Sequence, residues 1–319
     1  MKFLLTGTLL LLSLFLAEGL LRKFLPAEAP HPCREKVEGE RHRYRPECRA
    51  EKDFSTNEDG LRDRPRKFFA AKKTVLVLGG NNVEGIGLPA ESTLPRQLEV
   101  QLPSWTFLNG GQEGASPTQL RIQAERYAAH YPLRAVLLVI NETDVAQERL
   151  AQALASRLDE TGAPVKLGHY DSILPSWLDY LQKRSSSRIV SYLAELHLWQ
   201  ERKRLVHTQE LREEIFCSGI KSLARLNLPV FTLAVPVAAH SESNQRLSLP
   251  NDPIDFTKMI ECAKKHSRAV WDLRSTLINR GVPIGMGRGL SVEVAKAVAE
   301  ELKPLLGSKL PTARSQKTQ

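Results

Sequence analysis

A buried strand that runs directly into a glycine-rich turn, Thr74 to Gly87 (TVLVLGGNNVEGIG), constrains this chain more than any other stretch. The strand, Val75 to Leu78, is apolar without alternation, which is typical of a parallel strand covered on both faces. Gly79 and Gly80 allow the backbone to turn tightly at the strand's carboxyl end, where open α/β sheets bind their ligands. Asn81 occupies the tip of this turn, where an enzyme would place a nucleophile. The sequence therefore predicts a sheet-edge site with an amide at its centre.

Strand and helix patterns alternate after residue 74, which predicts a parallel sheet between two layers of helices. The expected strands cover residues 75–78, 105–108, 135–140, 230–237 and 269–273, and the expected helices cover 117–131, 255–266 and 291–306. A largely helical insertion, about 144–222, interrupts this pattern and could cover the carboxyl edge of the sheet. The predicted fold class is α/β, a three-layer α/β/α sandwich with five parallel strands over residues 74–308, followed by a disordered polar tail at 309–319.

The first 25 residues predict export or membrane attachment. No charge occurs between Lys2 and Glu18, a span of 15 residues, which fits a signal peptide or a short transmembrane anchor. No good cleavage site lies close to the apolar core, so an uncleaved anchor with an extracytoplasmic domain is favoured, and cleavage would give a secreted protein. Because Arg22 and Lys23 oppose the positive-inside rule, a cytoplasmic domain on an inverted anchor is the alternative.

Residues 26–73 are charged and contain five prolines, so this segment is interpreted as a linker or amino-terminal extension. From Arg22 to Lys73 there are 15 Lys or Arg against 10 Asp or Glu, which is +5 of the chain's formal net charge of +9. This mixed-charge run carries no nucleic-acid motif. A tether near a membrane therefore explains the basic character better than a nucleic-acid partner does.

Four cysteines in an exported chain allow two disulfides. Cys33 and Cys48 lie in a polar segment that could not bury free thiols well, so a bridge between them is expected. Cys217 and Cys262 flank the fourth expected strand, and either a second bridge or two buried thiols fits them. Two histidines near the first pair do not have the spacing of a zinc module, so no metal and no cofactor is expected.

The order and spacing of these elements resemble the SGNH/GDSL hydrolase superfamily, in particular its membrane-anchored bacterial members. The match rests on the first block with its continuation at Leu88 to Thr93, on a second block at Leu108 to Gly111, and on the lead-in Phe54 to Asp63. Glu18 followed by Leu21 and Arg22 is similar to the anchors of such proteins. The resemblance implies a flavodoxin-like α/β/α fold and ester hydrolysis on carbohydrates or lipids. It also implies that the amide of Gly111 donates to an oxyanion.

The other functional positions depart from the family pattern. Gly80 and Asn81 replace the family's Asp-Ser, and an amide has no usable nucleophilic oxygen. Thr143 replaces the oxyanion asparagine, and Met286 and Gly289 stand where the family has its acid and base. No nucleophile, base and orienting acid remain together, so no catalytic residue is expected at these positions.

The leading hypothesis is a pseudoenzyme that binds a carbohydrate, an acyl-ester ligand or an envelope partner without hydrolysis. The expected ligand-binding residues are those with amide, hydroxyl or backbone donors at the strand ends: Asn81, Asn82, Asn109, Gly111, Asn141 and Thr143.

Other interpretations remain open at this point. An active esterase or acyltransferase could have relocated its catalytic residues, with Ser116 and His240 as substitutes, although Ser116 fits a helix cap and His240 a loop. Glu142 and Asp144 could contact a ligand or serve as first-turn acids of the next helix. The domain could instead be a structural subunit of an envelope assembly, for which an apolar patch on Ile189 to Leu205 would be the sign.

Overall fold

The structure is a computed structural model of the 319-residue chain. It describes residues 16–20, 32–35, 43–50, 54–70, 72–85, 87–153, 155–158, 164–167, 188–208, 226–235, 253–279 and 292–307. Single positions at 13, 175, 178, 180–181, 217, 219–221 and 223 are also described. His240, Met286 and Gly289, which the sequence analysis discussed, lie outside these described residues, as does most of the segment 1–25.

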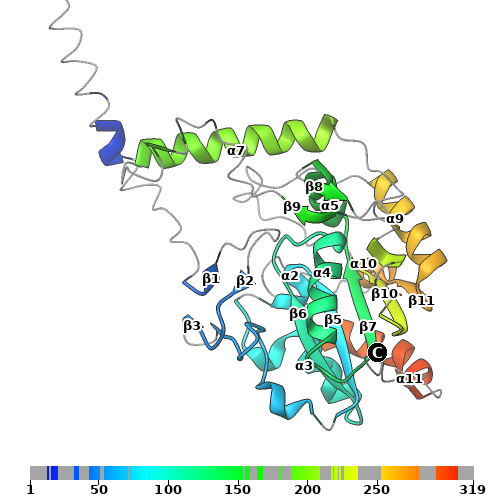
Figure 1. The fold of residues 1–319 in the computed structure, drawn as a ribbon. Helices are drawn as coiled ribbons and strands as arrows, with labels where there is room; N and C mark the ends of the chain where they lie inside the picture. Colours follow the sequence, from blue (N-terminus) through cyan, green and yellow to red (C-terminus); the bar gives the residue numbers. More distant parts are fainter. Residues whose placement is uncertain are drawn as a thin grey trace, which may run out of the picture.

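A five-stranded parallel sheet forms the centre of the fold, as the sequence predicts (Figure 1). Its strand order is β11-β10-β7-β5-β6. The strands are β5 (Thr74–Gly79), β6 (Thr106–Gly111), β7 (Leu133–Ile140), β10 (Val230–Ala234) and β11 (Ala269–Asp272). Every residue of β5 is buried, because β5 lies between β7 and β6 and is covered on both faces.

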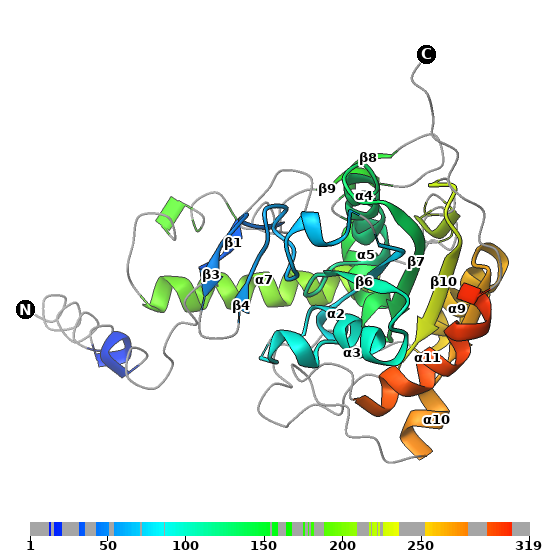
Figure 2. The same ribbon diagram turned by 90° about the horizontal axis from the view of Figure 1, so that it is seen from below.

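Helices cover both faces of the sheet, which gives the expected three layers (Figure 2). On one face, Val75 and Val77 of β5 pack in a core with α3 (Leu94–Gln101) and α11 (Val292–Gly307). On the other face, Leu76 and Leu78 pack with α4 (Pro117–Ala128) and α9 (Pro253–His266). Side chains of successive strand residues point to opposite faces, so a single apolar strand supplies both cores.

The described part of the insertion at 144–222 is largely helical, as expected, and it also contains a short pair of strands that the sequence did not predict. After α5 (Thr143–Ala153), β8 (Ala155–Leu158) pairs antiparallel with β9 (Pro164–Leu167). The long helix α7 (Arg188–Thr208) follows. Within the described ranges, no helix has the length and apolarity needed to cross a membrane.

The charged segment before the sheet packs against the domain. It forms two small antiparallel ladders, β1 (Arg34–Glu35) with β2 (Arg43–Tyr44) and β3 (Arg49–Ala50) with β4 (Phe54–Ser55). A 3₁₀ turn, η1 (Arg66–Phe68), then leads to β5, and the side chains of Leu61 and Phe69 are buried in the sheet domain's core. The segment therefore contributes to the folded domain in addition to connecting it to the amino terminus.

Both pairs of cysteines are joined in the structure. Cys33 bonds to Cys48 within the amino-terminal extension, and Cys217 bonds to Cys262 of α9. For the second pair, the alternative of two buried free thiols therefore does not describe this structure. Cys262 is buried in the core beneath α9, and Cys217 packs against the same core.

Candidate functional site

The glycine-rich turn lies at the carboxyl end of β5 and begins the short helix α2 (Asn81–Glu84). Gly80 occupies the N-cap position of α2, and a Cβ added to it would meet no atom within 4 Å. Asn81 is half-buried, and its side-chain oxygen Oδ1 is buried without a hydrogen-bond partner among the described residues. Asn82 beside it is also half-buried. The centre of the expected site therefore holds an amide with an unused acceptor.

The end of β6 supplies Asn109 and Gly111 next to this turn. Asn109 is buried, and its Oδ1 accepts a hydrogen bond from the amide of Gly111 at 3.0 Å. Its Nδ2 lies 3.5 Å from the carbonyl oxygen of Glu84. The Gly111 amide, which the family resemblance assigns to an oxyanion, is thus already bonded to a side chain of its own strand.

Close packing of α2 on β6 explains why position 111 is a glycine. A Cβ at Gly111 would lie 2.2 Å from the backbone nitrogen of Glu84 and 2.7 Å from its Cα. These are backbone atoms of α2, which cannot move aside as a flexible side chain could. Gly85, at the end of α2, has φ +71, so glycine also suits the left-handed turn that ends the helix.

The turn after β7 uses its polar groups internally. Oδ1 of Asn141 accepts hydrogen bonds from the backbone nitrogen of Thr143 at 2.9 Å and from its hydroxyl at 2.6 Å. Oδ2 of Asp144 accepts from the backbone nitrogen of Asn141 at 2.7 Å. Burial raises the pKa of Asp144 to about 8. Asp144 was expected either to contact a ligand or to serve as a first-turn acid, and in the structure it lies in the first turn of α5.

Glu142 and Arg274 form an ion pair across the carboxyl edge of the sheet. Arg274 begins α10 (Arg274–Asn279), directly beyond β11, and its guanidinium lies 2.7 Å from Asp272 and 3.4 Å from Glu142. The hydrogen bond from Arg274 is the main cause that lowers the pKa of Asp272. Because β10 lies between β7 and β11, this pair joins the turns on either side of β10. No sequence pattern indicated this ion pair.

A buried carboxyl group, Glu84, stands behind the turn and was missed by sequence reasoning. It accepts hydrogen bonds from the hydroxyl of Tyr44 and from the backbone nitrogen of Glu113. Burial is the largest cause that raises the pKa of Glu84 to about 7. Arg34 donates to the Tyr44 hydroxyl at 3.1 Å and also pairs with Glu113. The amino-terminal extension is therefore bonded to the helix that carries Asn81.

Arg62, which also belongs to the extension, holds the same carboxyl end of α2. Its guanidinium donates to the carbonyl oxygen of Glu84 at 2.9 Å, and it also donates to the carbonyl oxygens of Gly85 and Leu88. Carbonyl groups at the end of a helix have no partner within the helix, and a basic side chain can satisfy them. The extension thus determines the position of the turn through Tyr44 and Arg62 together.

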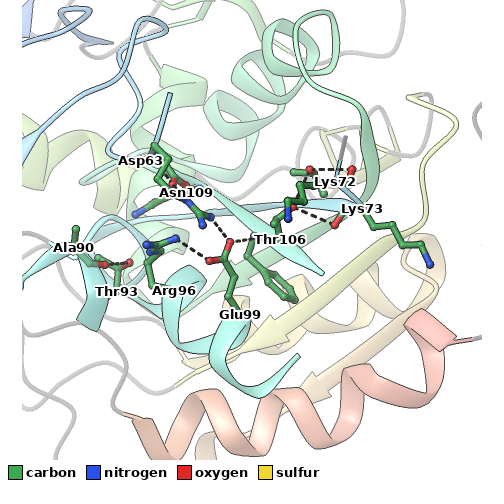
Figure 3. A network of polar contacts seen from close by, with 12 residues as sticks. Asp63, Lys72, Lys73, Ala90, Thr93, Arg96, Glu99, Thr106 and Asn109 are labelled. Atoms are coloured by element: carbon green, nitrogen blue, oxygen red, sulfur yellow. Dashed lines mark hydrogen bonds and ion pairs between the residues drawn. The ribbon is translucent and has the colours of Figure 1, made fainter. Parts of the chain in front are cut away.

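A second polar network fixes β6 to the extension and to α3 (Figure 3). Oδ2 of Asp63 accepts from the backbone nitrogen of Asn109 at 2.7 Å, and burial raises the pKa of Asp63 to about 6. Glu99 accepts from the backbone nitrogen of Phe107 at 2.9 Å and pairs with Arg96 at 2.8 Å. These bonds hold β6 at Phe107, near its start, and at Asn109, in its second half.

No described nucleophile and base converge on Asn81. Ser116 is buried as the N-cap of α4, where its side chain accepts from the backbone nitrogen of Gln119 at 3.3 Å. His130 precedes β7 and His266 precedes β11, so both belong to the amino edge, opposite the turn. His197 lies within α7.

A small hollow borders Gly111 on the side of the extension and does not include Asn81. It is lined by Arg43, Tyr44, Gly60, Leu61, Arg62, Gly111, Gln112, Gln123 and Tyr127. Among the described residues, the donor atoms of Cys217, Cys262 and His266 lie within 4.8 Å of one another, as metal ligands would. The two sulfurs are bonded to each other, so they offer no thiolate to a metal.

Neither a family model nor a curated protein matches this chain. Solved structures match its fold at low sequence identity. A lipase/acylhydrolase from Enterococcus faecalis is 11% identical, with 76% of this chain and 100% of that chain covered and a TM-score of 0.42. A member of the lipolytic G-D-S-L family from Veillonella parvula is 13% identical, with 74% and 99% covered and a TM-score of 0.36. A psychrotrophic esterase from Pseudoalteromonas is 8% identical, with 74% and 97% covered and a TM-score of 0.36. One of these similar structures carries the G-D-S-L name of the family that the sequence resembles.

Proposed function

We propose that this chain is a non-hydrolysing, SGNH-like protein that binds an uncharged carbohydrate or acyl-ester ligand at the carboxyl edge of its sheet. The observation that carries the proposal is Asn81, an amide at the nucleophile's place with a buried side-chain oxygen that accepts no described hydrogen bond. An amide cannot attack an ester carbonyl, because it has no proton that a base could remove to give a nucleophilic oxygen. It can accept and donate hydrogen bonds.

An unused buried acceptor favours a ligand that brings a donor. A buried polar group left unsatisfied costs roughly 1–3 kcal/mol. A hydroxyl group of a sugar, bonded to Oδ1 of Asn81, would remove that cost, and the amide of Asn82 lies next to it on the same helix.

The charges at this edge favour an uncharged ligand. The guanidinium of Arg274 is held between the carboxylates of Asp272 and Glu142, so it is already neutralised. An anionic ligand would have to compete with both carboxylates for this arginine. A neutral ligand with hydroxyl and ester oxygens meets no such competition, which supports a carbohydrate or an acylated carbohydrate as the ligand class.

The proposed location is the extracytoplasmic side of a bacterial membrane. The paired cysteines, Cys33 with Cys48 and Cys217 with Cys262, support an oxidising compartment, because disulfides are rare where thiols are kept reduced. The uncharged stretch between Lys2 and Glu18 supports attachment to the membrane. An envelope protein partner is compatible with this location.

Two assays on the purified full chain test the proposal. The first follows hydrolysis of p-nitrophenyl acetate and of acetylated xylo-oligosaccharides, and we expect rates equal to buffer for the unmodified chain and for Asn81→Ala. Steady turnover that Asn81→Ala abolishes would refute a binding role without chemistry. The second is calorimetric titration with the same oligosaccharides, in which Asn81→Ala should lose the binding heat. Gln101→Ala is the matched control, because Gln101 ends α3 at the opposite edge of the sheet and its loss should leave binding unchanged.

The rival function is an esterase or acyltransferase whose catalytic residues lie elsewhere in the chain. A fluorophosphonate probe distinguishes the two functions, because it labels an activated serine covalently. We expect no labelling of the native chain. Labelling of a single serine, lost after denaturation, would support the rival and contradict the proposal.

A further inference from the structure

The helix α7 carries apolar side chains on its solvent side. Its inner face packs Ala194 and Leu198 against Leu178. On its outer face Leu193 is 45% exposed and Leu196 is 37% exposed. A surface helix normally presents polar residues to water, so two neighbouring exposed leucines indicate a surface that meets something other than water.

Exposed apolar side chains gather in the same part of the molecule. Eight large apolar side chains are exposed among the described residues, and only Phe68 and Val100 lie outside the segments 16–20, 180–181 and α7. The other six are Leu16, Leu20, Tyr180, Leu181, Leu193 and Leu196. This concentration defines one candidate interaction surface.

The amino-terminal residues meet α7 at its first turn. Oε2 of Glu18 accepts a hydrogen bond from the backbone nitrogen of Ile189 at 3.0 Å. Figure 1 shows the short helical turn of residues 16–20 against the start of α7. The 15 residues before Glu18, back to Lys2, contain no charge. The chain's most apolar stretch therefore ends beside the first turn of α7, the helix that carries the exposed leucines.

The charges near this surface suit anionic lipid headgroups. The sequence of α7 has a net charge of +2, because it contains four basic residues (Arg188, Arg202, Lys203 and Arg204) and two acidic ones (Glu195 and Glu201). In the sequence, Arg22 and Lys23 follow residues 16–20. Helices that lie in a membrane interface combine exposed Leu with Lys and Arg and do not span the bilayer.

We propose that α7 lies on the surface of an anionic lipid bilayer, with Leu193 and Leu196 in the headgroup region and Leu16 and Leu20 beside them. This surface is separate from the ligand site at Asn81, so the inference holds whether or not the proposed ligand binds. A lipid surface is favoured over a protein partner because the uncharged amino-terminal stretch ends at the start of α7. The sheet domain would then be held at a fixed orientation to the membrane.

A lipid-quenching experiment on the full chain tests this. Leu193→Cys and Leu196→Cys, each labelled with an environment-sensitive NBD dye under non-reducing conditions, are reconstituted in vesicles of phosphatidylcholine and phosphatidylglycerol. Lipids with a nitroxide near the headgroup should quench the emission of both labels. Val100→Cys is the matched control, because Val100 is 68% exposed on α3, away from α7, and its label should keep its emission.

Each other result overturns the proposal or part of it. Labels at 193 and 196 that nitroxide lipids do not quench would refute contact with the bilayer. Emission that is shifted to the blue without quenching would mean that a protein partner or a second copy covers α7 instead. Quenching at Val100 as well would mean non-specific adhesion. The same loss of emission in phosphatidylcholine alone would refute the role of the basic residues.

Discussion

Replacement of Glu84 by glutamine should make this protein more stable at neutral pH. Glu84 is fully buried, and burial raises its pKa from 4.5 to about 7. The folded state thus prefers the protonated acid, which contributes stability below pH 4.5 that is lost as the pH rises through 7. A shift of 2.5 units (7 − 4.5) at 1.36 kcal/mol per unit corresponds to about 3 kcal/mol. Glutamine resembles the protonated acid and has no charge to bury.

The difference in free energy of unfolding between Glu84→Gln and the unmodified chain measures the cost of burying the ionised carboxylate of Glu84. Urea unfolding at a series of pH values should give a small difference below pH 4.5 that grows in favour of the variant to about 3 kcal/mol above pH 7. Glu113→Gln is the control. It removes the carboxylate that pairs with Arg34 and leaves Glu84 buried, and because burial is the largest cause that raises the pKa of Glu84, most of the unmodified chain's pH slope should persist. A difference between Glu84→Gln and the unmodified chain that does not vary with pH would refute the reasoning.

Four further substitutions test the turn and the extension. Gly111→Ala should lower the free energy of unfolding by about 1–3 kcal/mol, because the added Cβ would lie 2.2 Å from the backbone nitrogen of Glu84. Gly80→Ala should change the free energy of unfolding little, because its Cβ would meet no atom within 4 Å. Equal losses for the two variants in urea unfolding would contradict this. Cys33→Ser removes a disulfide between residues 15 apart and should cost about 3 kcal/mol under non-reducing conditions. Asn81→Ser alone should give no hydrolysis of p-nitrophenyl acetate, and measurable turnover would contradict that expectation.

The sheet could be predicted because buried parallel strands have a recognisable pattern of consecutive apolar residues in the sequence. Residues 75–78 of β5 and 135–140 of β7 are continuous apolar runs, and Ser116 was expected as the cap of the helix that begins at Pro117, where it is the N-cap of α4. The β8–β9 pair was missed because its strands are short and lack an apolar run, so nothing separated them from their helical surroundings. Sequence patterns thus identified the elements that bury apolar surface on two faces.

The polar contacts of the candidate site could not be predicted, because they join residues far apart in the chain. Tyr44 is 40 residues from Glu84, and Arg274 is 132 residues from Glu142. A tyrosine or an arginine in a charged segment has many possible partners, and only the folded chain selects one. Gly111 was recognised from its motif, but the close approach of α2, which excludes a side chain there, appears only in three dimensions.

The hydrogen bonds around the turn explain why an added serine should not restore hydrolysis. A hydrolase needs donors that stay free for the negative charge formed in the transition state. Here the amide of Gly111 is bonded to Asn109, and the hydroxyl of Thr143 is bonded to Asn141. A serine at position 81 would therefore lack preorganised oxyanion donors as well as a described base. Those two donors stabilise the turns themselves, and the side-chain oxygen of Asn81 beside them is a buried acceptor without a hydrogen-bond partner among the described residues.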